Sequence, residues 1–135
     1  MRYLLDTNVL SELRKRQRGN ARVRAWFEVA MTESLFLSVM SLGELRQRVE
    51  RKRRNDAVAA RDLERWLEAM SALYADRILP IDERVAQQWG RLNVPDPLPA
   101  VDGLLAATAL VHELTIVTRN TKDFLRTGAH VFDPF

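Results

Sequence analysis

The chain has 135 residues, a formal net charge of +3 and no cysteine. This length fits a single domain, residues 1–135, that can bury a substantial core without covalent cross-links. The lack of cysteine excludes disulfide bonds, thiolate catalysis and cysteine-bound zinc, and it is compatible with a reducing cytoplasm. The first apolar run stops at Asp6 and the run at 104–111 is too short to span a bilayer, so we expect a soluble cytoplasmic protein without a signal peptide.

Five short runs rich in apolar residues predict strands, and the first, Tyr3-Leu4-Leu5, is typical of a strand that is buried on both faces. Such strands belong to parallel sheets that are covered by helices. The first run is followed at once by Asp6. The runs are residues 3–5, 35–39, 78–81, 115–118 and 130–132. We therefore expect an α/β fold with a central, mostly parallel sheet of about five short strands flanked by helices.

Helical periodicity and capping residues predict the helices between these strands. We expect Thr7 and Asn8 to cap a short helix through Leu13. We also expect Ser41 and Glu44 to form a capping box that opens the helix after the second strand. Further helices are predicted at 21–31, at 57–75, after Asp82 and at 101–114. The apolar stripe of the 57–75 helix comprises Leu63, Trp66, Leu67, Met70, Leu73 and Tyr74.

Several polar residues fall where strands end or helices begin. Asp6 follows the first strand, and Asn120 and Asp123 follow the strand at 115–118. Glu44 and Asp102 lie in the first turns of helices, where capping or the helix dipole also explains an acid. In a parallel sheet these positions share one edge and project into one cleft. Like charges about 4 Å apart repel by about 4 kcal/mol, so such a cluster must protonate, pair with cations or hold a metal.

The ligand types in this cluster indicate which metal it suits. Carboxylate oxygens without cysteine or paired histidines favour Mg²⁺ or Mn²⁺. Such an ion lowers the pKa of a bound water and polarises a phosphoryl group. Both effects are what phosphodiester hydrolysis requires, so the pattern points to that reaction.

Four motifs in this order resemble the PIN-domain ribonucleases. The motifs are Asp6-Thr7-Asn8, Ser41-x-Gly43-Glu44-Leu45, Asp102-Gly103 with Thr108-Ala109, and Thr118-Arg119-Asn120-x-x-Asp123-Phe124. The spacing, the length and the final Phe132-Asp133-Pro134-Phe135 are most similar to the VapC-type toxins of bacterial toxin-antitoxin pairs. The resemblance covers essentially the whole chain.

The resemblance implies a Mg²⁺- or Mn²⁺-dependent endoribonuclease that cuts single-stranded segments of structured RNA such as tRNA or rRNA. It carries Asp6, Glu44 and Asp102 over as metal-site acids, with Asp6 and Asp102 as direct ligands. Relatives differ in whether the fourth acid lies at the position of Asn120 or of Asp123, and we take Asp123 as catalytic. The resemblance also implies a homodimer and a cognate antitoxin, which blocks the acidic cleft and binds operator DNA through its own domain.

Other polar and basic residues are assigned around this site. Residues 1–54 carry 13 basic and 6 acidic side chains, and residues 55–135 carry 8 and 12, so net charges of +7 and −4 sum to +3. A basic run is commonly a solvated face, and a footprint for nucleic-acid phosphates is the alternative. Candidate RNA contacts are Arg14, Arg46, Arg48 and Arg119. The secondary polar site comprises Thr7, Asn8, Thr118 and Asn120, in which Thr7 or Thr118 is a candidate partner of a metal-bound water.

Three other functions compete with a nuclease. A phosphoacceptor receiver domain requires adjacent acids after the first strand, where this chain has Asp6, Thr7 and Asn8. A haloacid-dehalogenase-type phosphatase requires an aspartate at the position of Asn8. A non-catalytic PIN-like module would bind RNA or a protein partner through its basic half and cut nothing.

Overall fold

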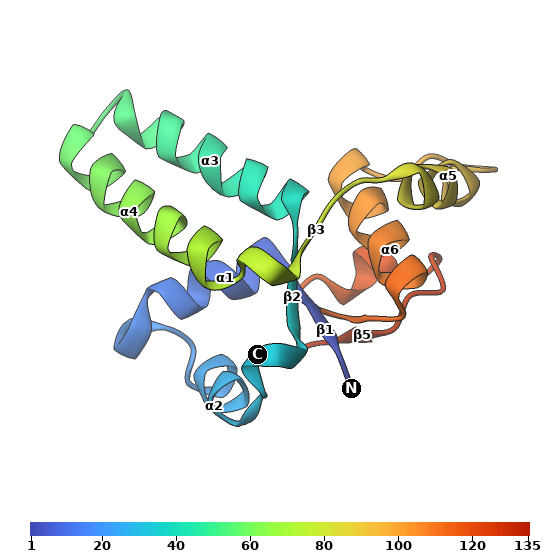
Figure 1. Ribbon diagram of the computed structural model, residues 1–135, viewed down its shortest axis with the longest axis horizontal. Coiled ribbons are helices and arrows are strands. Elements are labelled where there is room, and N and C mark those ends of the chain that lie inside the picture. Colours follow the sequence, from blue (N-terminus) through green and yellow to red (C-terminus); the bar gives the residue numbers. More distant parts are fainter.

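The computed structural model describes residues 1–135 and contains a five-stranded sheet in which every strand pairing is parallel (Figure 1). The strands are β1 (Tyr3–Leu5), β2 (Leu35–Ser38), β3 (Ile78–Leu79), β4 (Thr115–Val117) and β5 (Val131–Phe132). Their order in the sheet is β3-β2-β1-β4-β5. The predicted α/β fold with about five short strands is therefore confirmed.

Six α-helices surround the sheet. They are α1 (Thr7–Arg14), α2 (Ala21–Val29), α3 (Val39–Arg53), α4 (Ala57–Leu73), α5 (Glu83–Leu92) and α6 (Ala100–His112). In Figure 1, α3 and α4 form a helical arm that extends from one side of the sheet, and α5 and α6 lie on the other side. None of the helices has the length and apolar character needed to cross a membrane.

Both faces of the sheet are buried, because neighbouring residues of the central strands point to opposite faces. Leu5 of β1 and Val117 of β4 belong to the apolar core shared with α1, α2, α3 and α4. Leu4 and Ile116 belong to a second core shared with α6. All four side chains are 0% exposed. Burial on both faces explains why these strands are uniformly apolar in sequence.

The N-cap of helix α1 lies one residue before the predicted caps. Its N-cap is Asp6, whose side chain accepts a hydrogen bond from the backbone N–H of Thr7. The prediction that Thr7 or Asn8 caps this helix is therefore wrong. Asp6 takes this role because its backbone is still extended at the end of β1, which is the conformation that an N-cap residue needs.

The predicted capping box is also wrong. The helix α3 begins at Val39 and is capped by Ser38, whose hydroxyl accepts from the backbone N–H of Met40. Ser38 has the extended backbone of a residue that ends a strand, whereas Ser41 is fully buried inside the helix. The side chain of Glu44 is therefore not used to close the start of α3.

The apolar stripe of α4 is buried over most of its length. Leu67, Met70 and Tyr74 are buried. Leu73 departs from the prediction, since it is the last residue of α4 and is 61% exposed. This exposed leucine provides a natural comparison for the buried leucines of the strands.

We expect Leu4→Ala to lower the free energy of unfolding by about 2–5 kcal/mol, because it leaves a cavity beside α6 at a fully buried position. The matched control Leu73→Ala removes the same atoms from an exposed position and should change it by less than about 0.5 kcal/mol. Denaturant titration followed by circular dichroism measures both changes. Equal losses in the two variants would contradict the packing described here.

Candidate functional site

The carboxyl ends of β1 and β4 lie side by side at the point where the strand order of the sheet reverses. From β1 the chain goes to β2 and β3 on one side, and β4 and β5 lie on the other. Leu5 pairs with Val117, and the backbone N–H of Asp6 donates to the Val117 carbonyl at 3.0 Å. Asp6 and Thr118, which follow these strands, are therefore neighbours. Open parallel sheets bind ligands at such a point.

Three donors orient the carboxylate of Asp6. Its Oδ1 accepts from the backbone N–H of Thr7 at 2.7 Å, and its Oδ2 accepts from the hydroxyl of Thr118 at 2.8 Å. The side-chain amide of Asn8 donates to the same Oδ2 at 3.4 Å. Asp6 is 9% exposed, and burial raises its pKa although the bonds from Thr118 and Thr7 act in the opposite direction.

Asn8 and Thr118 connect the segments that follow β1 and β4. The amide Nδ2 of Asn8 donates to the Thr118 hydroxyl at 3.2 Å, and its Oδ1 accepts from the backbone N–H of Arg119 at 3.1 Å. The Thr118 hydroxyl also accepts from the backbone N–H of Asn120 at 3.0 Å. Thr118 is fully buried. The polar residues singled out in the sequence therefore hold Asp6 in one orientation.

Glu44 reaches the site from α3. Its Oε1 accepts a hydrogen bond from the hydroxyl of Thr7 at 2.7 Å, across 37 residues of sequence. Because Thr7 adjoins Asp6, this contact brings the Glu44 carboxylate into the neighbourhood of Asp6. Repulsion between the two carboxylates contributes to the raised pKa of Asp6.

Asp102 lies in the first turn of α6, as the sequence predicts. Burial, followed by repulsion from Asp123, Asp6 and Glu44, raises its pKa to about 6. These four carboxylates therefore share one region of the molecule although they come from four separate segments. The negative charge gathered there is only partly balanced by hydrogen-bond donors.

The start of α6 is shaped by a close approach of α5. A Cβ atom on Gly103 would lie 3.1 Å from the indole ring of Trp89, so glycine lets the two helices pack closely beside Asp102. A hollow of about 720 Å³ lies between the same helices near the far end of α6. Its lining comprises Glu83, Arg84, Gln87, Gln88, Arg91, Leu110, Val111 and Glu113, and none of the four acids.

Asp123 lies in the short 3₁₀ helix after β4, Thr121–Phe124, and is exposed. Its charge contributes to the raised pKa values of both Asp6 and Asp102. Asn120 precedes this helix, but its side chain makes no capping hydrogen bond. Asn120 carries no charge, and the carboxylate of Asp123 lies within electrostatic reach of Asp6 and Asp102.

The donor set fits a hard divalent cation in chemical type. It consists of carboxylate oxygens and the hydroxyls of Thr7 and Thr118, which are ligand or outer-shell groups for Mg²⁺ and Mn²⁺. In the arrangement that the structure shows, Asp6 and Glu44 bond to these threonines, and no three acids or histidines are close enough to enclose an ion. A cation at this edge would offset the repulsion that raises the pKa of Asp102.

The four predicted RNA contacts lie in different surroundings. The guanidinium of Arg48 contacts the hydroxyl of Ser11, and that of Arg119 lies over the ring of Phe135, 5.0 Å from its centroid. Arg14 is exposed at the end of α1. Arg46 instead forms ion pairs with Glu64 of α4 and with Glu50 of its own helix. Of the four, only Arg46 forms ion pairs with acids.

The PIN domain family model matches residues 3–129. Toxin FitB of Neisseria gonorrhoeae is 37% identical over 141 residues, covering 98% of this chain and 97% of that protein. VapC ribonuclease Y4jK of Sinorhizobium fredii is 34% identical over 141 residues, covering 98% and 96%. The crystal structure of FitAcB from Neisseria gonorrhoeae has a TM-score of 0.89 at 37% identity, covering 98% and 97%.

We expect Asp102→Asn to raise the melting temperature of the metal-free protein at pH 7.5. The folded-state pKa of about 6 lies above the ordinary value of 3.8, so the ionised carboxylate destabilises the fold. This loss of stability grows as the pH rises above 3.8 and is complete above about pH 6. After allowance for solvent screening the gain is about 1 kcal/mol, or about 3 °C. Below about pH 3 the carboxyl group is protonated in both the folded and the unfolded state, and the gain should disappear.

Calorimetry in EDTA at pH 7.5 and at about pH 3 measures the melting temperatures of the wild type and of Asp102→Asn. Asp62→Asn, which neutralises an exposed carboxylate on α4, is the control and should not reproduce it. A melting temperature that falls in Asp102→Asn at pH 7.5 would show that Asp102 is stabilised, not strained, by its neighbours.

Proposed function

The chain belongs to the PIN-domain family, and on this premise we propose that it is a metal-dependent endoribonuclease, the toxin of a bacterial toxin-antitoxin pair. The observation that carries the proposal is the convergence of Asp6, Glu44, Asp102 and Asp123 at the carboxyl edge of β1 and β4. Relatives named as a toxin and as a VapC ribonuclease support the role and the reaction. The proposed substrates are tRNA or rRNA.

Asp6 and Asp102 would hold Mg²⁺ or Mn²⁺ directly, and Glu44 would complete the metal site. When bound, the ion supplies a nucleophilic water at neutral pH and neutralises charge on the phosphoryl oxygens. The other polar groups of the site orient the proposed metal ligands. The Thr118 hydroxyl and the Thr7 amide orient Asp6, while the Thr7 hydroxyl orients Glu44.

The protonation states suit this role at neutral pH. Asp102, with a pKa of about 6, is mostly ionised at pH 7 and able to bind a cation. Its repulsion by the other carboxylates falls when the cation binds, so binding of the ion is coupled to loss of a proton. We propose Asp123 as the fourth catalytic acid, because its charge contributes to the raised pKa values of both Asp6 and Asp102.

The proposed partner is a cognate antitoxin protein, since a toxin that cuts RNA must be held inactive in its own cell. It would act by covering the acidic edge of the sheet. We propose that two toxin chains form a homodimer, that toxin and antitoxin join in a larger assembly, and that DNA is reached only through the antitoxin. The name of the related Toxin FitB supports this assignment.

The decisive experiment compares cleavage of total RNA by the wild type, Asp6→Asn and Asp102→Asn. We expect the wild type to cut RNA with Mn²⁺ and to stop in EDTA. Each variant should lose more than about 100-fold in rate, because removal of a ligand costs at least as much as removal of an outer-shell partner. Asp62→Asn is the control and should cut at the wild-type rate.

Equal cleavage by all four proteins would overturn the proposed site. A wild type that binds RNA but cuts none in the presence of Mn²⁺ would identify a non-catalytic binding module instead.

Thr118→Val should weaken Mn²⁺ binding by about 10- to 100-fold, which is typical when an outer-shell partner of a metal ligand is removed. Valine keeps the volume of the fully buried threonine but cannot donate to the Asp6 carboxylate. Thr118→Ser keeps the hydroxyl and should bind Mn²⁺ nearly as the wild type does. Isothermal titration calorimetry compares the three proteins, and equal affinities would exclude an orienting role for Thr118.

A further inference from the structure

Two contacts join α1 to α3 at matching intervals. The hydroxyl of Thr7 donates to Glu44 at 2.7 Å, and four residues farther along both helices the guanidinium of Arg48 donates to the hydroxyl of Ser11. Residues four apart lie on the same face of an α-helix. The face of α3 that carries Glu44 to the acids therefore continues outward with Arg48, and the face of α1 that carries Thr7 continues with Ser11.

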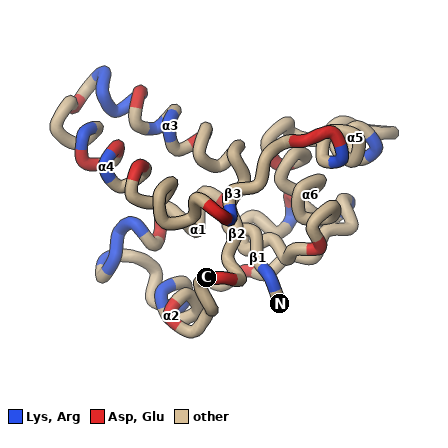
Figure 2. Tube along the Cα trace, viewed as in Figure 1, with Lys and Arg blue, Asp and Glu red and all other residues tan.

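The next turn of each of these two faces is basic. Seven and eight residues after Glu44, α3 has Arg51 and Lys52, and seven residues after Thr7, α1 has Arg14. We call Arg14, Arg48, Arg51 and Lys52 the basic track. All four side chains are exposed, and none forms an ion pair with an acid. Figure 2 shows these basic segments on the outer half of α3 and at the end of α1.

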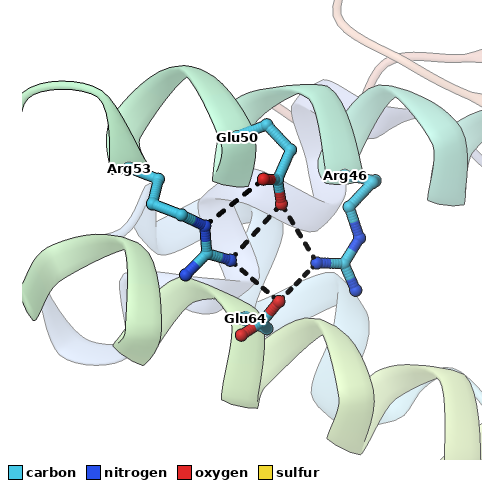
Figure 3. Close-up of polar contacts among 4 residues, drawn as sticks. All are labelled: Arg46, Glu50, Arg53 and Glu64. Carbon is cyan, nitrogen blue, oxygen red and sulfur yellow. Dashed lines mark hydrogen bonds and ion pairs between the residues drawn. The ribbon is translucent and has the colours of Figure 1, made fainter. Parts of the chain in front are cut away.

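The arginines on a different face of α3 are neutralised by carboxylates. Arg46 and Arg53 both pair with Glu64 of α4, at 2.5 and 2.9 Å, and both pair with Glu50, at 3.4 and 3.3 Å (Figure 3). Their pKa values are raised by these carboxylates. The six basic residues between 46 and 54 are thus divided by helix face. Arg46 and Arg53 serve the contact between α3 and α4, Arg54 is the C-cap of α3, and Arg48, Arg51 and Lys52 keep their charge available to a ligand.

We propose that the basic track binds the phosphates of an RNA strand on one side of the cleavage site. This inference deepens the proposed nuclease function and rests on it. The acidic site repels a polyanion, so the strand needs cations next to the acids to hold it there. The track begins one helical turn, about 5.4 Å, from Glu44 and extends outward along α3.

The composition of the track favours nucleic acid over a protein partner. The large apolar side chains that are exposed in this protein include none from α1 and none from residues 44–54. A protein interface has a core depleted of charge and enriched in aromatic and other apolar groups. A stripe of unpaired cations without apolar neighbours is instead the footprint of a phosphate backbone.

The test measures binding of a single-stranded RNA oligonucleotide in EDTA by fluorescence anisotropy, at several salt concentrations. Arg48→Gln combined with Arg51→Gln should lower the slope of log affinity against log salt by about 1.4, or about 0.7 for each phosphate that is no longer neutralised. The matched control combines Arg61→Gln and Arg65→Gln, which removes two exposed charges of α4 from the same helical arm and should leave the slope unchanged.

A second variant tests the geometry without removing charge. Ser11→Ala frees Arg48 from its partner on α1 and should weaken RNA binding by at most about fivefold, because the hydrogen bond that positions Arg48 is lost, with the slope unchanged. Circular dichroism melting verifies that each variant is folded. An unchanged slope in the track variant, or equal decreases in the track and control variants, would overturn the proposal.

The same proteins separate this inference from the nuclease proposal. Asp6→Asn should bind the oligonucleotide with the wild-type slope and cut nothing with Mn²⁺. If the wild type cuts RNA but the track variant keeps the wild-type slope, the RNA-binding role of the basic track is overturned and the nuclease proposal is retained. If no protein cuts RNA but the slope is lower in the track variant, the nuclease proposal is overturned and RNA binding by the basic track is retained. Loss of antitoxin binding alone in the track variant would make this surface a protein interface and overturn the proposal.

Discussion

The parallel pairing of β1 with β4 is the constraint on which the rest of this site depends. Their register sets Leu5 opposite Val117, so the residues that follow, Asp6 and Thr118, emerge at one edge and hydrogen-bond across 112 residues of sequence. That edge is also where the strand order reverses, which leaves room outside the sheet for a ligand. A shift of one residue in the pairing would turn the buried side chains to the opposite faces and separate the acid from its donor.

The site holds repelling charges that the rest of the fold offsets. Asp6 and Asp102 both have raised pKa values, and part of the cause is the other carboxylates. Two apolar cores, one on each face of the sheet, stabilise the strands that hold these groups in place. The proposed cation would reduce this repulsion when it binds, as protonation of the carboxylates does.

The helix α3 shows how one element serves three purposes on three faces. Leu45 and Val49 are buried against the sheet, and Arg46 faces Glu64 of α4. Glu44 and Arg48 lie on the face that meets α1. The periodicity of the helix separates these faces. A single basic run of sequence therefore contains some cations that form ion pairs and others that are proposed to bind RNA. The ion pairs of the arm and the proposed RNA contacts therefore do not compete for the same side chains.

Strands buried on both faces leave a local signature, so their apolar runs and the acids at their ends could be predicted without coordinates. Capping was less predictable, because Ser38 and Ser41 both satisfy the composition of a cap and only the end of β2 decides between them. Periodicity likewise placed Leu73 on the apolar stripe but could not show that it is exposed where α4 ends. Glu44, Arg46 and Arg48 each have a partner on another helix. Packing between distant segments chooses such partners, and no short-range pattern records that choice.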